Sequence, residues 1–523
     1  MGAMRGGSDG GVEACAPKML AARTKCARNA VLRPDTAPVR CSFPGPIPDD
    51  MHRSSSPRDE RFLLPVLLDT AAALSRQFLD GINDRPVQPG AVILPEVRLP
   101  ELGVGTQAVL EQLRDTVLPA LTGSAGPRYL GFVTGGGTPA ALAADWITSA
   151  VDNNASDASS VAAVTIERQA IAMLVDLLSL PEATAGWFVS GATMANVVGL
   201  ATGRQWLGEA RGVDVSEDGA GALPGLRILS ATPHASAVKA AAVLGIGRRA
   251  VQQVATVAGT ERIDVAALAA ALHESDQPTI IIANAGTVTS TAFDDLSAVG
   301  ALAARHRAWL HVDGAFGLFA ALLPSHAHQL TGLHLADSIC GDAHKWLNVP
   351  YDSGFALTRH ADVQSRVFRN AASYFFAAGP IPDPFHFVPE NSRRLRALPV
   401  WASLLAYGRS GMADIVAECC ACATNLGAWI TAHPDLELLA PVGLNIVAFR
   451  LSDALLAGRD EATVTAAFLS AVAATGEVFL TPGAYGGRRG ARAAFSNWRT
   501  TVGDDLPRIQ RGVVAGLDAV RLR

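Results

Sequence analysis

Residues 278–296, PTIIIANAGTVTSTAFDDL, and residues 308–316, AWLHVDGAF, decide the fold of this 523-residue chain. Each segment opens with a short apolar run and closes on small or polar residues, which is typical of a strand buried on both faces. Further segments repeat the pattern and alternate with helical stretches, at residues 186–206, 226–246, 336–350 and 353–359. The alternation predicts a mainly parallel sheet between helices, with a ligand beyond the carboxyl ends of its strands.

The sequence outside this pattern divides into further segments. Residues 1–60 are rich in Gly, Pro, Ser and Arg and show no hydrophobic period, so we expect a disordered extension. Residues 61–124 are predicted to be helical. A large domain at 125–385 then precedes a smaller α+β domain at 386–523, which opens with a long helix over 391–412 and ends on another helix.

The overall composition and charge disfavour some classes of partner. Hydrophobic residues make up 49% of the chain and charged residues 17%, which is a globular composition. The net charge of −5 gives no basic surface, so neither nucleic acid nor a membrane surface is expected as a partner. No run of about 18 apolar residues predicts a membrane span. At the N-terminus, an unstructured extension is favoured over a transit peptide.

The seven cysteines are odd in number and irregularly spaced, which argues against a disulfide framework. Cys419 and Cys422 have the spacing of half a metal site, but no second pair of Cys or His accompanies them. We therefore expect incidental cysteines, no metal, and a reducing cytoplasmic location.

Two strand ends carry candidate chemistry. In residues 342–346, DAHKW, Lys345 follows a buried strand, and a lysine amine held away from water can react with a carbonyl group. In residues 311–316, HVDGAF, Asp313 closes an apolar strand and needs a cationic partner, which the ring nitrogen of pyridoxal 5′-phosphate (PLP) would provide. Taken singly, these residues could equally be a surface lysine and a turn-capping aspartate.

Two strand–helix junctions add to this pattern. Residues 190–196, SGATMAN, place small residues and hydroxyls at a helix start, where backbone N–H groups hold phosphate. In residues 232–236, TPHAS, His234 lies just past a strand and could stack on a flat ring. Ordinary helix capping is the alternative for both junctions.

The order of phosphate loop, His, Asp and Lys resembles the group II PLP-dependent decarboxylases, which include aromatic-amino-acid, histidine, glutamate and diaminobutyrate decarboxylases. The resemblance extends from about Arg61 to the C-terminus, and the spacings of His234, Asp313 and Lys345 are similar to those of the aromatic enzymes. It implies an α/β aspartate-aminotransferase-like fold with a seven-stranded, mainly parallel sheet, a small C-terminal domain and N-terminal dimerisation helices. It also implies a homodimer.

The resemblance further implies a role for each matching residue. Lys345 holds PLP as a Schiff base, Asp313 pairs with the ring nitrogen, and His234 and Ala315 lie on opposite faces of the ring. The remaining cofactor-binding residues implied by the family motifs are Gly191, Ala192, Thr193, Thr287 and His344.

Other matches concern the reaction and the substrate. Tyr374 corresponds to the family's loop tyrosine, which protonates the substrate carbon after CO2 leaves; a tyrosine that only packs the loop is the alternative. Thr134 and Gly135 match a substrate-wall segment, and Arg393 matches a motif that steers an anionic group. This chain departs from the family at Asp342 and Ala343, where Asn-Pro is usual, in the Ala/Phe/Pro-rich loop after Tyr374, and in the small, flexible run at 134–137. These changes lie where the substrate is chosen, so the family's substrates cannot be transferred.

These matches predict a PLP-dependent decarboxylase that releases CO2 from an L-amino acid to give the amine. A Gly-rich, less polar pocket favours a bulky or apolar amino acid. An aminotransferase or carbon–carbon lyase of the same fold is the alternative, because Arg488, Arg489 and Arg492 could clamp a carboxylate. A non-catalytic PLP binder is disfavoured by the intact Lys345, Asp313 and His234.

Overall fold

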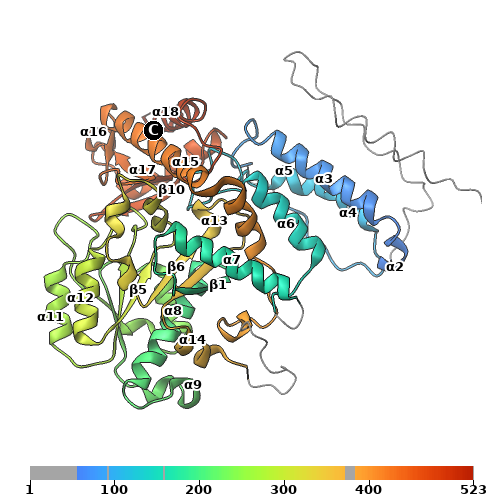
Figure 1. Cartoon of the computed structure of the whole chain (residues 1–523). Helices are drawn as coiled ribbons and strands as arrows, with labels where there is room; N and C mark the ends of the chain where they lie inside the picture. The colour runs from blue at the N-terminus through green and yellow to red at the C-terminus, as the bar shows by residue number, and fades with distance from the viewer. Residues whose placement is uncertain (1–55, 91–92, 157–159, 371–382, 522–523) are drawn as a thin grey trace, which may run out of the picture. The chain divides into compact units, whose positions relative to one another are not determined.

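The computed structural model describes residues 56–90, 93–156, 160–370 and 383–521. These residues form two compact units, a short one of residues 56–74 with 100–110 and a main one of residues 75–99 with 111–521. The short unit holds α2 (Pro57–Glu60) and most of α3 (Leu64–Asp80) and α4 (Thr106–Gln112), coloured blue in Figure 1. Glu60 accepts hydrogen bonds from the backbone N–H (2.7 Å) and the hydroxyl (2.5 Å) of Thr106 and so joins α2 to α4.

The main unit is built on a seven-stranded sheet of order β1-β7-β6-β5-β4-β2-β3. Only β7 runs antiparallel to its neighbours, β1 and β6, so the predicted mainly parallel sheet is confirmed. The strands are β1 (Ala185–Val189), β2 (Arg227–Ser230), β3 (Val251–Gln253), β4 (Thr279–Asn284), β5 (Trp309–Asp313), β6 (Ser338–Asp342) and β7 (Gly354–Thr358).

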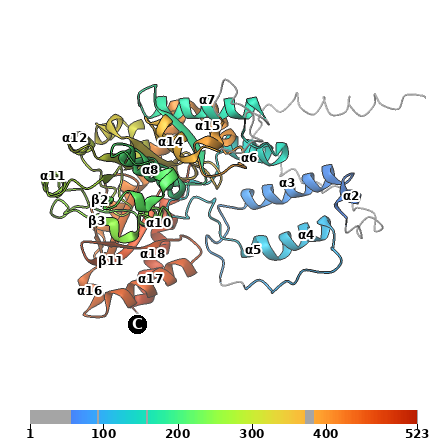
Figure 2. The same ribbon diagram turned by 90° about the horizontal axis from the view of Figure 1, so that it is seen from below.

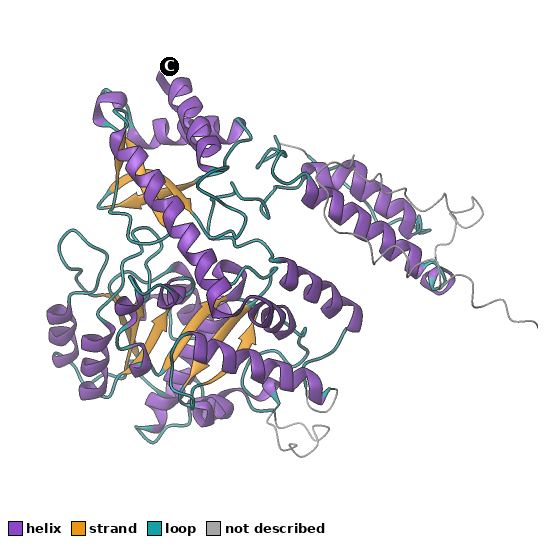
Figure 3. Ribbon diagram, turned by 45° about the horizontal axis from the view of Figure 1, so that its top comes forward, coloured by secondary structure: helices purple, strands orange, loops and turns teal. Residues whose placement is uncertain are grey.

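Both faces of this sheet are buried, which explains the continuous apolar runs in the sequence. Along β4, Ile280 and Ile282 pack on one side, while Ile281 and Ala283 pack on the other. Helices cover both faces in Figure 3. The helices around the sheet are α6 (Pro139–Val151), α7 (Val161–Leu177), α8 (Ala192–Glu209), α9 (Val215–Asp218), α10 (Ala235–Val243), α11 (Val265–His273), α12 (Leu296–His306), α13 (Ala343–Trp346) and α14 (Ala361–Phe368). The short helix α5 (Leu118–Ala120) precedes them in the chain.

A second, four-stranded antiparallel sheet of order β10-β11-β9-β8 forms the small domain. Its strands are β8 (Leu436–Leu438), β9 (Ile446–Leu451), β10 (Thr481–Tyr485) and β11 (Arg488–Ala494). The helices α16 (Asp453–Leu456), α17 (Glu461–Ala474) and α18 (Leu506–Arg521) are grouped beside β11 in Figure 2. This domain is the α+β region expected after the large sheet.

The long helix α15 (Ala397–Ala432) packs against α6 and α7 and also against β8 and β9. Its backbone leaves the helical conformation at Gly408 (φ 60°), where a residue without Cβ is favoured. Among the residues placed by the structure, α15 alone is long and apolar enough to cross a membrane, although the sequence showed no unbroken apolar run of that length. Its apolar stretch is 44% buried within this fold, as in the core helix of a globular domain.

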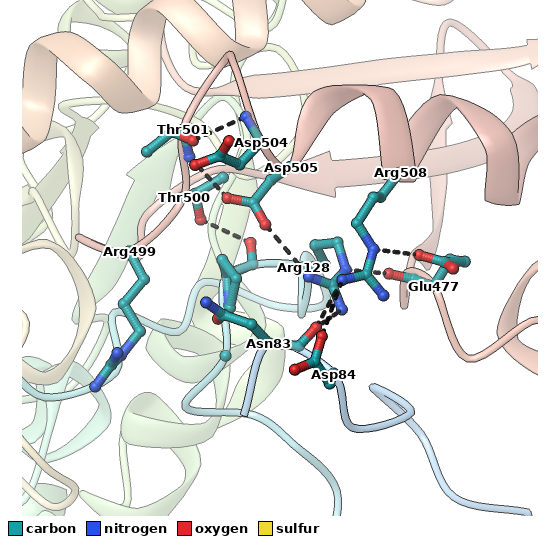
Figure 4. A network of polar contacts seen from close by, with 12 residues as sticks. Asn83, Asp84, Arg128, Glu477, Arg499, Thr500, Thr501, Asp504, Asp505 and Arg508 are labelled. Carbon is teal, nitrogen blue, oxygen red and sulfur yellow. Dashed lines mark hydrogen bonds and ion pairs between the residues drawn. The ribbon is translucent and has the colours of Figure 1, made fainter. Parts of the chain in front are cut away.

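Arg128 ties the segment before α6 to the small domain rather than to the large sheet. Its guanidinium donates to the carbonyl oxygens of Glu477 (2.8 Å) and Asn83 (2.7 Å) and to the carboxylate of Asp505 (3.3 Å), as Figure 4 shows. Arg508 donates to Asn83 and to the carboxylate of Glu477 in the same network. Tyr129 and Leu130, which follow Arg128, lie beside the small sheet, within the range 125–385 that the sequence analysis assigned to the large domain.

Candidate active site

A cavity of about 1300 Å³ contains both Lys345 and His234. It extends from the carboxyl ends of the large sheet, where these two residues lie, to β10, β11 and α17 of the small domain. Its wall is mainly apolar, and the side chains that line it include Phe132, Val133, Val288, Thr289, Tyr351, Leu469, Arg489 and Arg492. The position agrees with the sequence expectation that a ligand sits beyond the carboxyl ends of the strands.

Lys345 lies in the short helix α13, directly after β6. Its Nζ pairs with Asp342 at 2.8 Å and lies 6.0 Å from the centre of the Phe316 ring. The backbone carbonyl of Lys345 packs on Gly135, where a Cβ would lie 1.8 Å from the carbonyl oxygen. Gly135 therefore positions the lysine through its backbone, and no side chain fits there.

Asp313 ends β5 and is surrounded by hydrogen-bond donors. One carboxylate oxygen faces the Ala315 N–H (3.2 Å) and the Cys340 thiol (3.3 Å), and the other faces the Asn196 amide (3.4 Å). Burial raises the pKa of Cys340 well above its ordinary value, so the thiol keeps its proton and can donate. Donors alone suit a carboxylate rather than a carboxylic acid.

His234 is the N-cap residue of α10, and its Nδ1 receives the backbone N–H of Ser236 at 3.3 Å. Burial lowers the pKa of His234, the charge of Asp313 opposes this shift, and the charge of Lys345 adds to it. These side chains are therefore close enough to interact electrostatically. With Nδ1 accepting, a neutral His234 carries its proton on Nε2.

The predicted phosphate loop lies at the start of α8. Gly191 is the N-cap residue, and the Thr193 side chain is exposed. The Ala192 N–H is already taken by the Asp342 carboxylate at 2.5 Å. His344 borders the loop, 3.5 Å from Asp342, and burial lowers its pKa.

Several predicted site residues lie elsewhere. The Thr287 hydroxyl donates to Glu261 at 2.6 Å, and its neighbours Val288 and Thr289 line the cavity instead. Thr134 contacts the Tyr351 hydroxyl at 3.3 Å and lines a separate small cavity. Tyr374 lies outside the described residues.

Arg393 is also placed away from the cavity, contrary to the expected role in steering substrate. Its guanidinium forms a two-pronged pair with Glu167 of α7, at 2.9 and 3.0 Å, and donates to the carbonyl of Phe188. Because Glu167 already neutralises it, Arg393 holds α7 and β1 together, and we withdraw its substrate role.

The sequence reasoning missed residues that the structure brings to the site. Asn196 contacts Asp313, although it was quoted only as part of the phosphate loop. Phe132 and Val133 line the wall where Thr134 and Gly135 were expected. Arg492 was noted only for a rival reaction, yet its guanidinium reaches the cavity from β11.

Comparison with known proteins agrees with this arrangement. The conserved-domain model for pyridoxal-dependent decarboxylases matches residues 89–452. The chain belongs to this family. It is 31% identical to an aromatic-L-amino-acid decarboxylase of Bacillus atrophaeus over 69% of this chain and 75% of that protein. It is 30% identical to an L-2,4-diaminobutyrate decarboxylase of Rhizobium meliloti, over 67% and 70% of the two chains.

Solved structures support the fold. The structure of Oryza sativa TDC with PLP and tryptamine aligns with a TM-score of 0.80 at 23% identity, covering 89% of this chain and 99% of that one. With the family established, the protein is a PLP-dependent carboxy-lyase that converts an amino acid to an amine. The expected aminotransferase-like fold is confirmed.

The residues present fit PLP. Asp313 provides a carboxylate with donors behind it for the ring nitrogen, and Lys345 provides an amine in the cavity. The start of α8, with the exposed Thr193, provides a phosphate-binding helix end. Asp342 opposes the phosphate, because its carboxylate, at the end of β6, accepts the Ala192 N–H at the start of α8.

Proposed function

We propose that Lys345 holds PLP covalently, that Asp313 keeps a proton on the ring nitrogen, and that His234 lies against one face of the ring. The bound cofactor supplies an electron sink for the charge left on the substrate's α-carbon when CO2 departs. The observations that support this proposal are the cavity shared by Lys345 and His234 and the donor-lined carboxylate of Asp313, whose charge acts on His234. Tyr374 returns the proton to that carbon in this scheme.

We further propose that the substrate is an L-amino acid with a large apolar side chain. Phe132, Val133, Val288 and Leu469 give the cavity an apolar wall on which such a side chain can be buried. Burying it contributes about 25 cal/mol for each Å² removed from water. The substrate carboxylate can approach Arg492, which has a buried nitrogen without a partner among the residues that the structure describes.

The test is to load the protein with PLP and measure CO2 and amine formation across the common L-amino acids. We expect the highest kcat/KM for large apolar or aromatic amino acids and no turnover by Lys345→Ala. A preference for acidic or small amino acids would contradict the substrate assignment. Accumulation of pyridoxamine phosphate without CO2 would contradict the reaction and support amino-group transfer.

We also propose that the enzyme is a cytoplasmic homodimer that acts without a membrane or nucleic acid. The family resemblance supports the homodimer. The net charge of −5 gives no excess of basic residues that would favour nucleic acid or a membrane surface. Light scattering on the purified protein should give twice the mass of one chain. A monomer that retains full activity would contradict the dimer.

A further inference from the structure

A line of buried polar side chains ends at Asp313. The indole N–H of Trp309 donates to the Ser338 hydroxyl at 3.0 Å, and that hydroxyl lies 2.7 Å from Nδ1 of His311. Nε2 of His311 lies 2.7 Å from Oδ1 of the Asn196 side chain, and Nδ2 of the same side chain donates to Asp313 at 3.4 Å. The first four residues are shielded from solvent, and Asp313 is 7% exposed.

The two ends of this line fix the direction of its hydrogen bonds. The Trp309 N–H can only donate, so Ser338 accepts it and passes its own proton toward Nδ1 of His311. At the other end, an ionised Asp313 can only accept, so Asn196 turns its NH2 group to Asp313 and its oxygen to His311. Both ends therefore require a neutral His311 with its proton on Nε2. Burial lowers the pKa of His311 to about 4, which agrees with the neutral form.

Helix α8 is shaped to cover these residues. A Cβ at Gly199 would lie 2.6 Å from Nδ1 of His311, and one at Gly203 would lie 2.6 Å from the Trp309 indole. Asn196, three residues before Gly199, lies on the same face of α8. Gly199 and Gly203 therefore make room for the imidazole and the indole, and Asn196, at the same helical spacing, contacts the imidazole directly.

A second branch leaves the line at Asn196. The same amide nitrogen donates to the Ser236 hydroxyl at 3.2 Å, and that hydroxyl lies 2.7 Å from Nδ1 of His234. Because Ser236 accepts from Asn196, its proton is directed to His234. Asn196 thus connects the carboxylate for the ring nitrogen with the imidazole proposed to lie on the ring face.

We propose that Trp309, Ser338, His311 and Asn196 are positioning residues that hold Asp313 ionised and oriented toward the cofactor's ring nitrogen. The inference rests on the proposed role of Asp313 and adds four residues that do not line the cavity. If a substitution reverses these hydrogen bonds, a second proton acceptor competes with the ring nitrogen. If a substitution breaks them, Asp313 loses the donor that orients it. The ring nitrogen then loses its proton.

The test is to load the protein with PLP carrying ¹⁵N in its ring and to record the NMR shift of that nitrogen. In the wild type we expect the shift of a protonated pyridinium. Asn196→Asp replaces the donating amide with a second carboxylate and should move the signal toward neutral pyridine. Ser338→Ala removes only the group that fixes the His311 tautomer, so the signal should move the same way by less.

Ser230→Ala is the matched control, because it removes a buried hydroxyl of β2 that makes no hydrogen bond. It should leave the ring-nitrogen signal unchanged. An unchanged signal in both Asn196→Asp and Ser338→Ala, with PLP bound, would overturn the inference, and Ser338→Ala decides alone if Asn196→Asp does not fold. A neutral ring nitrogen in the wild type would overturn the proposed role of Asp313 as well.

Discussion

Arg393 and Arg492 are buried equally well, with 4% and 5% of their surface exposed, yet their surroundings are opposite. Arg393 is paired through two nitrogens with Glu167, and its Nε has no partner among the described residues. Arg492 donates to the carbonyls of Val288 and Phe132, and its third nitrogen has no partner in the part of the chain described. Burial lowers the pKa of Arg492 to about 10. A paired buried charge builds the fold, whereas one left without a carboxylate at a cavity is available to a ligand.

His311 shows a third arrangement, in which a buried titratable group stays neutral. Burial lowers its pKa to about 4, and Asn196 and Ser338 use both ring nitrogens. The three residues differ in how a buried charge is avoided or used: Arg393 is paired with a carboxylate, His311 is neutral, and Arg492 keeps a charge with no carboxylate partner among the described residues at an apolar cavity wall. Replacing Arg393 or His311 should therefore change stability, whereas replacing Arg492 should change catalysis.

The largest effect is expected for Arg393→Met, which leaves Glu167 buried without its partner. Removing one member of a buried ion pair costs about 3–5 kcal/mol of unfolding free energy. Urea denaturation should show this loss, and the double variant Arg393→Met/Glu167→Met should recover part of it. An unchanged unfolding midpoint combined with a raised KM would return Arg393 to the substrate site.

The pH dependence of stability should reveal His311. Its pKa is about 4 in the folded protein and about 6.5 when unfolded, so only the unfolded chain binds the proton between these values. Its contribution of roughly 3 kcal/mol is present above pH 6.5 and is lost as the pH falls toward 4. The unfolding free energy, measured by urea denaturation from pH 7 to 4.5, should therefore fall more steeply for the wild type than for His311→Gln. Equal slopes would contradict a neutral buried imidazole.

Arg492→Met should reduce kcat/KM without lowering stability. Losing one partner of a desolvated charge pair with the substrate costs about 2 kcal/mol, or roughly thirtyfold. Arg489→Met is the matched control, because Arg489 lines the same cavity but is exposed. Equal losses in both variants would contradict a specific role for Arg492, and strong destabilisation would show that its role is structural.

The smallest effect is expected for Asp342→Asn, which removes a negative charge from the phosphate loop. PLP should bind about tenfold more tightly, a difference of about 1.4 kcal/mol. Titration of the apo-protein measures this, with the more exposed Asp352→Asn as the control. Weaker binding by Asp342→Asn would show instead that its contacts with Lys345 and Ala192 organise the site.

The sequence predicted the cofactor side better than the substrate side. Asp313 and Lys345 were recognisable because the order of phosphate loop, His, Asp and Lys along the chain is far more specific than any one of these residues. Long-range partners were hidden, since Asn196 contacts Asp313 across 117 positions and Glu167 contacts Arg393 across 226. Only the fold brings such residues together.

The substrate wall shows a different limit. The substrate-wall segment that holds Thr134 and Gly135 reaches the cavity, but the sequence could not tell which of its neighbouring residues face it. Gly135 packs on the Lys345 backbone, while Phe132, with a positive φ of 56°, and Val133 line the cavity. The orientation depends on contacts of this segment with the small domain, such as the Leu130 N–H to the Phe479 carbonyl.

The central claim is that Lys345 is the lysine that holds PLP. The chain has four lysines, Lys18, Lys25, Lys239 and Lys345, so the claim can be tested by a direct assignment. Borohydride reduction of the PLP-loaded protein, followed by peptide mass spectrometry, should place the phosphopyridoxyl group on Lys345 in the wild type and in Lys239→Ala. It should find none in Lys345→Ala. A label on another lysine, or an equal label in Lys345→Ala, would contradict the account.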